Sequence, residues 1–222
     1  LLGFLFKFFI RILLVFIFFI LSSCIFDNPN YMGIKSKTDL YLPEFNFQNQ
    51  NGVYISDADF SSKLVLVTFM YSNCKTECPS ALNDLKIFEN IRNEYKDELN
   101  IIIFSIDPVN DTQLQVKNLL NKYELNNSLD YLIADKYDLK VIWEHFYVPV
   151  AYVQSKSLKG NLILHSIPAY LISNQNKFTL IYTEFDIDSI KVDIKNILKK
   201  SAHGVANTPH FKIESIFARS DP

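Results

Sequence analysis

Apolar runs and amphipathic segments alternate along the middle of the chain. Two continuous apolar runs, 64–69 and 101–106, have the length and β-branched content of strands buried on both faces. Each is followed by a segment with apolar residues at helical spacing, and either Asp111 or Thr112 stands where it would cap the second of these helices. The alternation predicts an α/β fold with helices layered on a central mixed sheet.

Shorter patterns complete this fold. Residues on both sides of Asn51-Gly52 alternate in polarity, which predicts an N-terminal β-hairpin over 45–47 and 53–55. The remaining predicted elements are a strand at 131–133, a helix from a cap at Asp135 to 146, a strand pair at 169–172 and 178–182, and a closing helix at 189–200.

The first 24 residues have a different pattern. Lys7 and Arg11 precede an apolar run at 12–21 that ends in Leu21-Ser22-Ser23-Cys24. A basic segment, a short apolar segment and small residues before a cysteine resemble a bacterial lipobox, in which Cys24 is lipidated. An uncleaved anchor is the alternative, although the run is short for a membrane span of about 20 residues. Both readings predict export and attachment to the outer face of the cytoplasmic membrane.

The same patterns divide the chain into four parts. We expect a signal peptide or anchor at 1–24, a polar linker at 25–39, a folded domain at 40–200 and a tail at 201–222. The chain has 222 residues, 49% of them hydrophobic, and a net charge of −2. One domain with a full core is therefore expected, and the absence of a basic block argues against nucleic-acid binding.

The chemistry concentrates on a pair of cysteines. Only three cysteines occur, and Cys74 and Cys78 lie four positions apart between a buried strand and a helix that begins near Pro79. Cys78 is expected to cap this helix, whose N-terminus favours a thiolate. In an exported protein such a pair forms a disulfide or binds a metal ion. A structural zinc site needs four ligands, which a single pair does not supply.

A third ligand would have to come from a histidine. His165 precedes a core strand, whereas His145 is expected to be a packing residue at a helix end and nothing positions the two histidines of the tail. Asp107 follows the second buried strand and precedes Pro108, a position typical of a turn residue.

Three motifs together resemble the Sco/SenC family. The segment from Thr68 to Pro79 is similar to that family's TFxYTxCxxxCP motif, and 105–112 is similar to its S-[VI]-D-P-x-x-D-T segment. His165-Ser166, followed by Tyr170-Leu171-Ile172, resembles its HS…YLI segment. The family often has an acidic residue directly before the histidine, where this chain has Leu164.

The resemblance implies a thioredoxin-like fold and a copper site. Carried over to this sequence, copper as Cu(I) or Cu(II) would be bound by Cys74, Cys78 and His165, with Asp107 close to the site. Soft thiolates and an imidazole suit copper. The implied partner is the subunit of cytochrome c oxidase that carries the dinuclear CuA centre, with a thioredoxin-like reductant or a second copper chaperone upstream.

Two functions remain open from the sequence. The chain would deliver copper, or Cys74 and Cys78 would act as a redox pair that reduces the cysteines of the oxidase subunit or of other exported proteins. A cis bond at Pro168, the position of the thioredoxin cis-proline, would favour the second. A purely structural disulfide is the third reading, although so short a loop constrains little chain entropy.

Overall fold

The computed structural model describes residues 30–38, 40–61, 63–94, 98–154, 161–173 and 177–206, and a compact unit begins at Tyr31. The predicted signal segment, Cys24 included, lies outside these residues, as does the tail beyond Ala206. Within the described ranges, no helix combines the length and apolar character needed to cross a bilayer.

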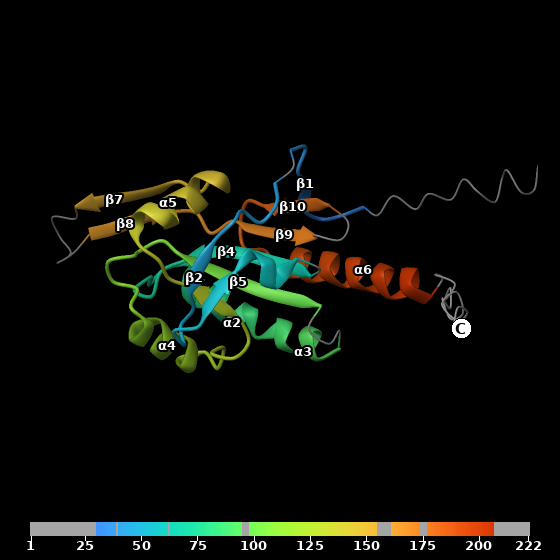
Figure 1. Cartoon of the computed structure of the whole chain (residues 1–222), viewed down its shortest axis with the longest axis horizontal. Helices are drawn as coiled ribbons and strands as arrows, with labels where there is room; N and C mark the ends of the chain where they lie inside the picture. The colour runs from blue at the N-terminus through green and yellow to red at the C-terminus, as the bar shows by residue number, and fades with distance from the viewer. Residues whose placement is uncertain are drawn as a thin grey trace, which may run out of the picture. The chain divides into compact units, whose positions relative to one another are not determined.

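A six-stranded mixed sheet forms the centre of the fold, in the order β1-β10-β9-β4-β5-β6 (Figure 1). Three strands are parallel, namely β4 (Leu64–Met70), β5 (Leu99–Ser105) and β6 (Asp130–Leu132). The other three, β9 (Ala169–Ser173), β10 (Phe178–Tyr182) and β1 (Ile34–Lys35), extend the sheet by antiparallel pairing on the far side of β4. The predicted mixed sheet is confirmed.

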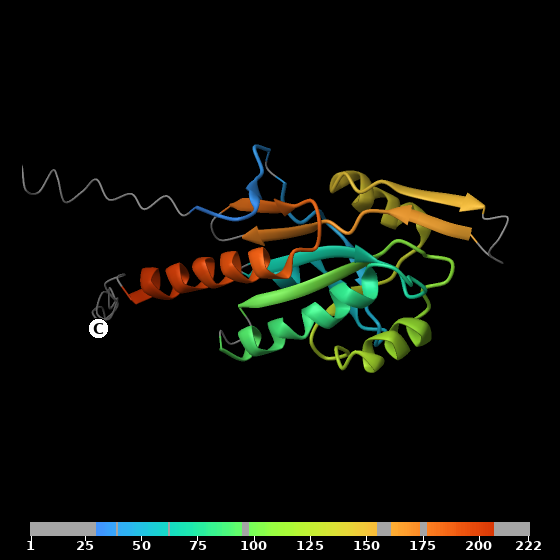
Figure 2. The ribbon, with the colours of Figure 1, turned by 180° about the vertical axis from the view of Figure 1, so that it is seen from behind.

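Both faces of the sheet are covered, which explains why all seven residues of β4 are buried. One core contains Leu64 and Leu66 with apolar residues from α2 (Cys78–Leu85), α3 (Ile87–Glu94), α4 (Gln113–Lys122) and α6 (Ile187–Ala206). The other contains Val65 and Val67 with residues from α5 (Lys136–His145) and the β2–β3 hairpin. Figure 2 shows the long α6 ribbon along the sheet from behind. Alternate residues of one strand thus point into two cores.

Most predicted elements are present. The predicted hairpin is formed by β2 (Asn46–Gln48) and β3 (Tyr54–Ser56). The Asp135 side chain caps α5 by accepting hydrogen bonds from the backbone amides of Tyr137 and Asp138. Thr112 caps α4 by accepting the amide of Gln115. The helical run after Pro79 is divided at Lys86 into α2 and α3 rather than continuous.

The domain begins earlier and ends later than the sequence predicted. β1 lies inside the predicted linker, and the amides of Met32 and Gly33 donate to the buried Asp193 carboxylate at 2.8 to 3.0 Å. A Cβ atom at Gly33 would lie 2.7 Å from the Tyr182 ring, so this approach requires glycine. α6 continues to Ala206, past the predicted boundary at 200. Residues 31–38 therefore belong to the folded domain.

A second hairpin was not predicted. It consists of β7 (Val150–Gln154) and β8 (Asn161–His165), which pair antiparallel from Val150 opposite His165 to Gln154 opposite Asn161. The Tyr152 hydroxyl donates to the Ile106 carbonyl at 2.9 Å, which ties the hairpin to the end of β5. His165 is the last residue of this hairpin, so the hairpin sets its position.

Candidate metal centre

The two cysteines lie at the C-terminal end of the central strand. After β4 the chain turns and enters α2, and a disulfide joins Cys74 to Cys78 with 5.8 Å between their Cα atoms. Cys78 is the first residue of α2, and Glu77 is its N-cap, so the prediction that Cys78 caps the helix is wrong. Pro79 lies in the first turn, as expected.

A backbone amide at the N-terminus of α2 contacts the sulfur of Cys74. The backbone N–H of Cys78 donates to Sγ of Cys74 at 3.4 Å. Cys74 is also the more accessible sulfur-bearing residue, 8% exposed against 1% for Cys78. A hydrogen-bond donor at a helix N-terminus stabilises a thiolate. In the reduced protein, Cys74 is therefore the sulfur better prepared to carry negative charge.

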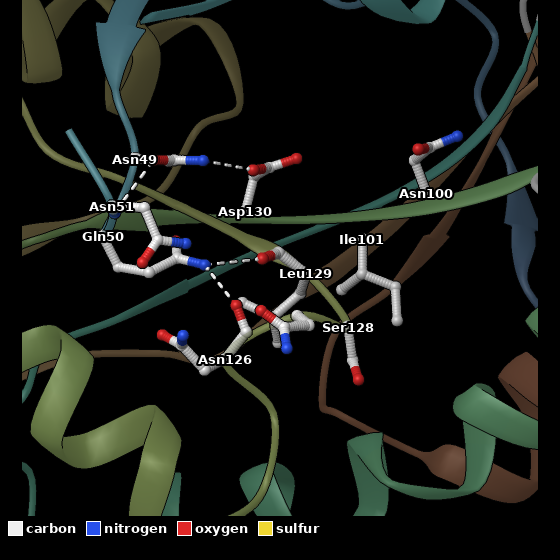
Figure 3. A pocket seen from close by; sticks show the side chains of 10 residues that line it. Asn49, Gln50, Asn51, Asn100, Ile101, Asn126, Ser128, Leu129 and Asp130 are labelled. Atoms are coloured by element: carbon white, nitrogen blue, oxygen red, sulfur yellow. Dashed lines mark hydrogen bonds between the residues drawn. The ribbon is translucent and has the colours of Figure 1, made fainter. Parts of the chain in front are cut away.

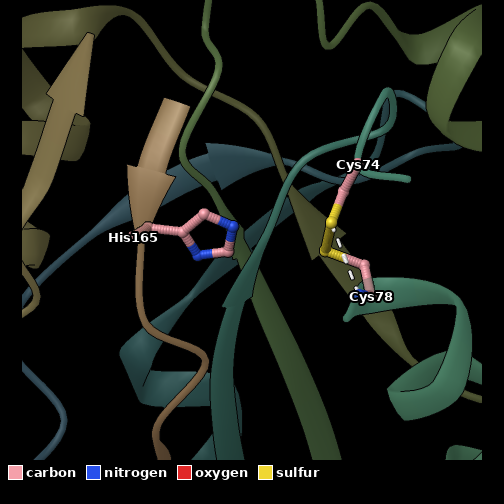
Figure 4. A group of neighbouring side chains, drawn as sticks. All are labelled: Cys74, Cys78 and His165. Atoms are coloured by element: carbon pink, nitrogen blue, oxygen red, sulfur yellow. Dashed lines mark hydrogen bonds between the residues drawn. A yellow bond between two sulfur atoms is a disulfide. The ribbon is translucent and has the colours of Figure 1, made fainter. Parts of the chain in front are cut away.

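His165 lies beside the cysteines, although it comes from a distant part of the chain. One ligand atom from each of Cys74, Cys78 and His165 lies within 4.8 Å of the others. Figure 4 shows the imidazole at the end of β8 directed toward the two sulfur atoms. The strand register explains this placement, because β9 follows His165 and pairs with β4, which leads into the cysteine loop.

Local contacts determine which imidazole nitrogen is free. Nδ1 of His165 lies 2.9 Å from the carbonyl oxygen of Ser166, and because a carbonyl only accepts, Nδ1 carries the proton. Nε2 then presents its lone pair, which a metal ion requires. Burial lowers the pKa of His165, against a smaller raising effect of the Ser166 hydrogen bond and of Glu77. The ring is therefore neutral at pH 7.

Aromatic and acidic residues surround the histidine. The Tyr71 ring packs edge-on against the imidazole with centroids 5.4 Å apart. Leu164, where the family often has an acid, is 52% exposed. The carboxylate that acts on His165 belongs instead to Glu77, inside the cysteine motif. Sequence reasoning missed Glu77, because its proximity to His165 arises only from the fold.

A buried aspartate supports the cysteine loop from beneath. Asp111 is 2% exposed and its carboxylate accepts three hydrogen bonds, from the Ser72 amide at 2.8 Å, the Ser105 hydroxyl at 2.6 Å and the Tyr131 hydroxyl at 2.8 Å. Burial raises the pKa of Asp111, and these hydrogen bonds oppose that rise. Of the two residues expected to cap this helix, Thr112 is the cap of α4, and Asp111 instead accepts the hydrogen bonds described above.

Asp107 has contacts of its own in the adjacent turn. It is 5% exposed, its carboxylate accepts from Nδ2 of Asn110 at 2.8 Å, and its amide donates to the Ser105 hydroxyl at 3.1 Å. Its charge contributes to raising the pKa of Tyr71, although burial of Tyr71 is the larger cause. These contacts make Asp107 a turn residue close to the site, and a role toward a bound metal stays a prediction.

His145 is a packing residue, as expected. Its Nε2 lies 2.8 Å from the Tyr41 carbonyl, and its ring contacts those of Tyr41 and Phe146.

Among the described residues no cis peptide bond occurs, so the bond before Pro168 is trans. The condition that would have favoured redox chemistry at Pro168 is therefore not met.

Two hollows lie near the sheet ends. A groove of about 660 Å³ adjoins the site and is lined by Thr76, Glu77, Asp84, His165 and Phe185, among others. A smaller hollow of about 260 Å³, rich in amide side chains, lies where β5 and β6 begin, at the opposite end of the sheet (Figure 3). There Gln50 donates to the carbonyls of Asn126 and Leu129, which joins the β2–β3 hairpin to the following loop.

Comparison with known proteins places the chain in a family. The SCO1/SenC family model matches residues 35–199. Among solved structures, copper-bound ScoI of Bradyrhizobium japonicum has a TM-score of 0.61 and 23% identity, and the match covers 70% of this chain and 98% of that chain.

Two other solved structures are 25% identical to this chain. A SCO1/SenC family lipoprotein from Bacillus anthracis has a TM-score of 0.59, with 73% of this chain and 95% of that chain covered. BsSco, a member of the Sco family of cytochrome c oxidase assembly proteins in which a disulfide switch was identified, has a TM-score of 0.57, with 75% and 98% covered.

The fold is that of a thioredoxin-like protein, and its two cysteines and one histidine lie close enough together to hold one metal ion. More particularly, the chain belongs to the SCO1/SenC family, because the family model spans most of its length.

Proposed function

We propose that this protein binds copper through Cys74, Cys78 and His165 and assists assembly of the CuA centre of cytochrome c oxidase. The observation that carries the proposal is that the three ligand atoms lie within 4.8 Å of one another. Membership of the family supports it, because relatives of this fold include a copper-bound ScoI and an oxidase assembly protein.

The chemistry of the donors suits copper as cargo. Two thiolates and a neutral imidazole are soft or borderline ligands, which favour copper over magnesium or calcium. The disulfide must first be reduced, because each sulfur needs its own lone pair and charge to bind the metal. A dithiol reductant supplies the two electrons and two protons and leaves as its own disulfide.

The test is an anaerobic copper titration of the reduced protein. Cys74→Ser, Cys78→Ser and His165→Ala are each expected to weaken copper binding by more than about 100-fold, beyond the 10- to 100-fold typical of residues that only support a ligand. His145→Ala is the matched control, since that histidine packs against Tyr41. Unchanged affinity in His165→Ala, with its circular dichroism spectrum intact, would remove His165 from the site.

A second function is favoured by the asymmetry of the cysteine pair. Cys74 is the more exposed cysteine, and its sulfur accepts a hydrogen bond from the Cys78 backbone amide. It is therefore the sulfur that would take part in thiol–disulfide exchange with a partner. In this alternative the protein reduces the disulfide of the oxidase subunit. The Cys74 thiolate attacks one partner sulfur, and the Cys78 thiolate then displaces the mixed disulfide, which leaves the partner as a dithiol and re-forms the Cys74–Cys78 bond.

Trapping experiments separate the two functions. Cys78→Ser is expected to accumulate a mixed disulfide between Cys74 and the oxidised oxidase subunit, whereas Cys74→Ser accumulates little. His165→Ala leaves trapping unchanged if exchange is the function, and abolishes only copper binding. The redox alternative is contradicted if the unmodified protein binds copper and its Cys78→Ser variant forms no mixed disulfide.

We also propose that the protein is exported and attached to the outer face of the cytoplasmic membrane through its first 24 residues. The segment that ends at Cys24 and the similarity to a SCO1/SenC family lipoprotein support this. Lipidation predicts that the mature chain begins at a modified Cys24, and Cys24→Ala would abolish lipid incorporation. A mature chain that keeps residues 1–23 would show the uncleaved anchor instead.

A further inference from the structure

A basic groove lies at the edge of the domain that the N-terminal segment forms. It has a volume of about 520 Å³, with residues 35–38, 40 and 41 on one side and residues of the β9–β10 hairpin on the other. Lys35, Lys37 and Lys177 line it, and all three side chains are exposed. Among the described residues, no carboxylate forms an ion pair with these lysines. Among the described residues, the groove thus presents three lysine side chains without a carboxylate in an ion pair.

The walls of the groove are held in place. The Ser36 amide donates to the Thr179 carbonyl at 2.8 Å, and the Thr179 hydroxyl donates to the Leu40 carbonyl. Nζ of Lys35 lies 5.5 Å above the Phe178 ring. These hydrogen bonds hold the backbone of the two walls side by side, and the lysines that line the groove extend from this ordered backbone.

Apolar side chains are exposed on the same segment. Met32 is 63% exposed, Ile34 is 65% exposed and Tyr41 is 61% exposed. Large apolar and aromatic residues interspersed with lysines are typical of surfaces that rest in the headgroup region of a bilayer.

From these observations we propose that the exposed residues Met32, Ile34, Lys35, Lys37 and Tyr41, together with Lys177, form a docking surface for the anionic lipid surface to which the chain is anchored. The inference rests on the proposed anchoring at Cys24. Lys35 follows Cys24 by eleven positions, so it stays within about 40 Å of the lipid even in a fully extended tether. A tether of this length keeps the bilayer at high effective concentration, so a weak electrostatic contact suffices.

Docking by this surface would orient the metal centre. The groove lies near Ser173 and Phe178, where β9 ends and β10 begins, whereas His165 precedes the start of β9. Leu64 pairs with Ser173, and the cysteine loop follows the other end of β4. With the basic groove on the bilayer, the cysteines and His165 point away from it, toward the extramembrane domain of a partner.

The test is lysine footprinting of the full chain in nanodiscs made of phosphatidylcholine alone or with one-third phosphatidylglycerol. The rate at which an amine reagent modifies Lys35, Lys37 and Lys177 is read by mass spectrometry. These rates are expected to fall at least about fivefold in the anionic nanodiscs, the factor per lysine that attraction to an anionic surface supplies. Lys117 and Lys122 on α4 are internal controls, and 0.5 M salt should restore the rates.

Two charge-matched variants complete the design. Lys35→Glu/Lys37→Glu should abolish the protection of Lys177, whereas Lys117→Glu/Lys122→Glu should leave it intact. Equal labelling rates in both lipids overturn the docking surface. Equal protection by inorganic phosphate in phosphatidylcholine nanodiscs also overturns it, in favour of a site for free phosphate.

The outcomes also separate this inference from the proposed anchoring. A chain that stays on phosphatidylcholine nanodiscs but shows no lipid-dependent labelling is anchored without the docking surface. A chain that leaves phosphatidylcholine nanodiscs yet binds anionic ones in a salt-sensitive way has the docking surface without the anchor.

Discussion

At the scale of single residues, the contacts of the His165 imidazole suit the role of metal ligand that we propose for it. The Ser166 carbonyl holds the proton on Nδ1, and burial favours the neutral ring. Glu77 opposes burial, because its carboxylate stabilises the protonated form. A neutral ligand avoids the competition with protons that an ordinary histidine meets below its pKa of about 6.5.

The pKa of His165 tests this balance. In the disulfide form, NMR titration is expected to give a value below the ordinary 6.5, because burial disfavours the charged ring. Glu77→Gln should lower the pKa further, since it removes the charge that favours protonation, and Glu94→Gln on α3 should not change it. A pKa above 6.5 would mean that Glu77 outweighs burial.

The lowered pKa of His165 makes the stability of the fold depend on pH. The folded-state pKa of His165 lies below its unfolded value, so the unfolded chain binds more protons in the window between them. Stability is therefore lost as the pH falls from the unfolded pKa to the folded one, and His165→Gln should flatten the pH dependence in that window. Urea denaturation at closely spaced pH values measures the difference.

The residues of the site could be foreseen from the sequence to different degrees. Cys74 and Cys78 stood out because they are four positions apart between a strand and a helix, and the motif resemblance singled out His165. The direction of the Cys78 amide and the proximity of Glu77 to His165 could not be foreseen. Both depend on the path of the loop between β4 and α2, which hydrophobic periodicity does not encode.

At the scale of elements, Asp111 joins three strand ends beneath the cysteine loop. Asp111→Ala would leave the Ser72 amide and the hydroxyls of Ser105 and Tyr131 without this acceptor, at an expected cost of about 3 kcal/mol. Tyr131→Phe removes one hydroxyl and should cost about 1 kcal/mol. Guanidinium denaturation measures both, with the exposed Asp138→Ala as control. Equal losses in Asp111→Ala and Asp138→Ala would contradict the network.

The β7–β8 hairpin presents His165, and one hydrogen bond ties it to the sheet. Tyr152→Phe removes the bond to the Ile106 carbonyl, worth about 1 kcal/mol. Amide exchange at 161–165 should become faster, and copper affinity should fall by less than about tenfold because the ligand itself remains. Tyr137→Phe, on an exposed face of α5, is the control. Unchanged exchange would show that the backbone pairing alone positions the hairpin.

The elements that escaped prediction share a physical cause. β4 and β5 are buried on both faces and read as continuous apolar runs, so they were evident. β1 has two exposed residues, and the two residues that precede it donate hydrogen bonds to the distant Asp193. β7 and β8 pair mainly with each other rather than with the main sheet. Short strands with few buried side chains leave a weak periodic signal.

At the scale of the whole molecule, the topology gathers motifs that are far apart in the chain. β4 and β5 are parallel, so the cysteine loop and the Asp107 turn leave the same edge of the sheet. β9 runs antiparallel to β4, so the residue that precedes it, His165, arrives at that edge too. The family resemblance implied that the cysteine loop and His165 lie close together, and the strand order of the sheet explains why they do.

The same topology attaches the N-terminal segment to the far side of the domain. The buried Asp193 of α6 accepts the amides of Met32 and Gly33 and, at 2.7 Å, the Tyr182 hydroxyl. Burial, together with the hydrogen bond to Asp193 and the charge of Asp193, raises the pKa of Tyr182 far above the ordinary value, so this hydroxyl stays a donor. The segment that follows the proposed anchor is thereby fixed to α6 and β10 instead of forming a free linker.

Asp193→Ala should release this segment and lengthen the effective tether. Three donors would lose their acceptor, at an expected cost of about 3 kcal/mol, whereas Tyr182→Phe removes one donor and should cost about 1 kcal/mol. Hydrogen exchange distinguishes release from general weakening. Amides of Met32 and Gly33 should lose protection far more than those of β4 and β5, which report global unfolding. Retained protection at Met32 and Gly33 would show that pairing of β1 with β10 holds the segment by itself, and the domain would then keep its short tether without Asp193.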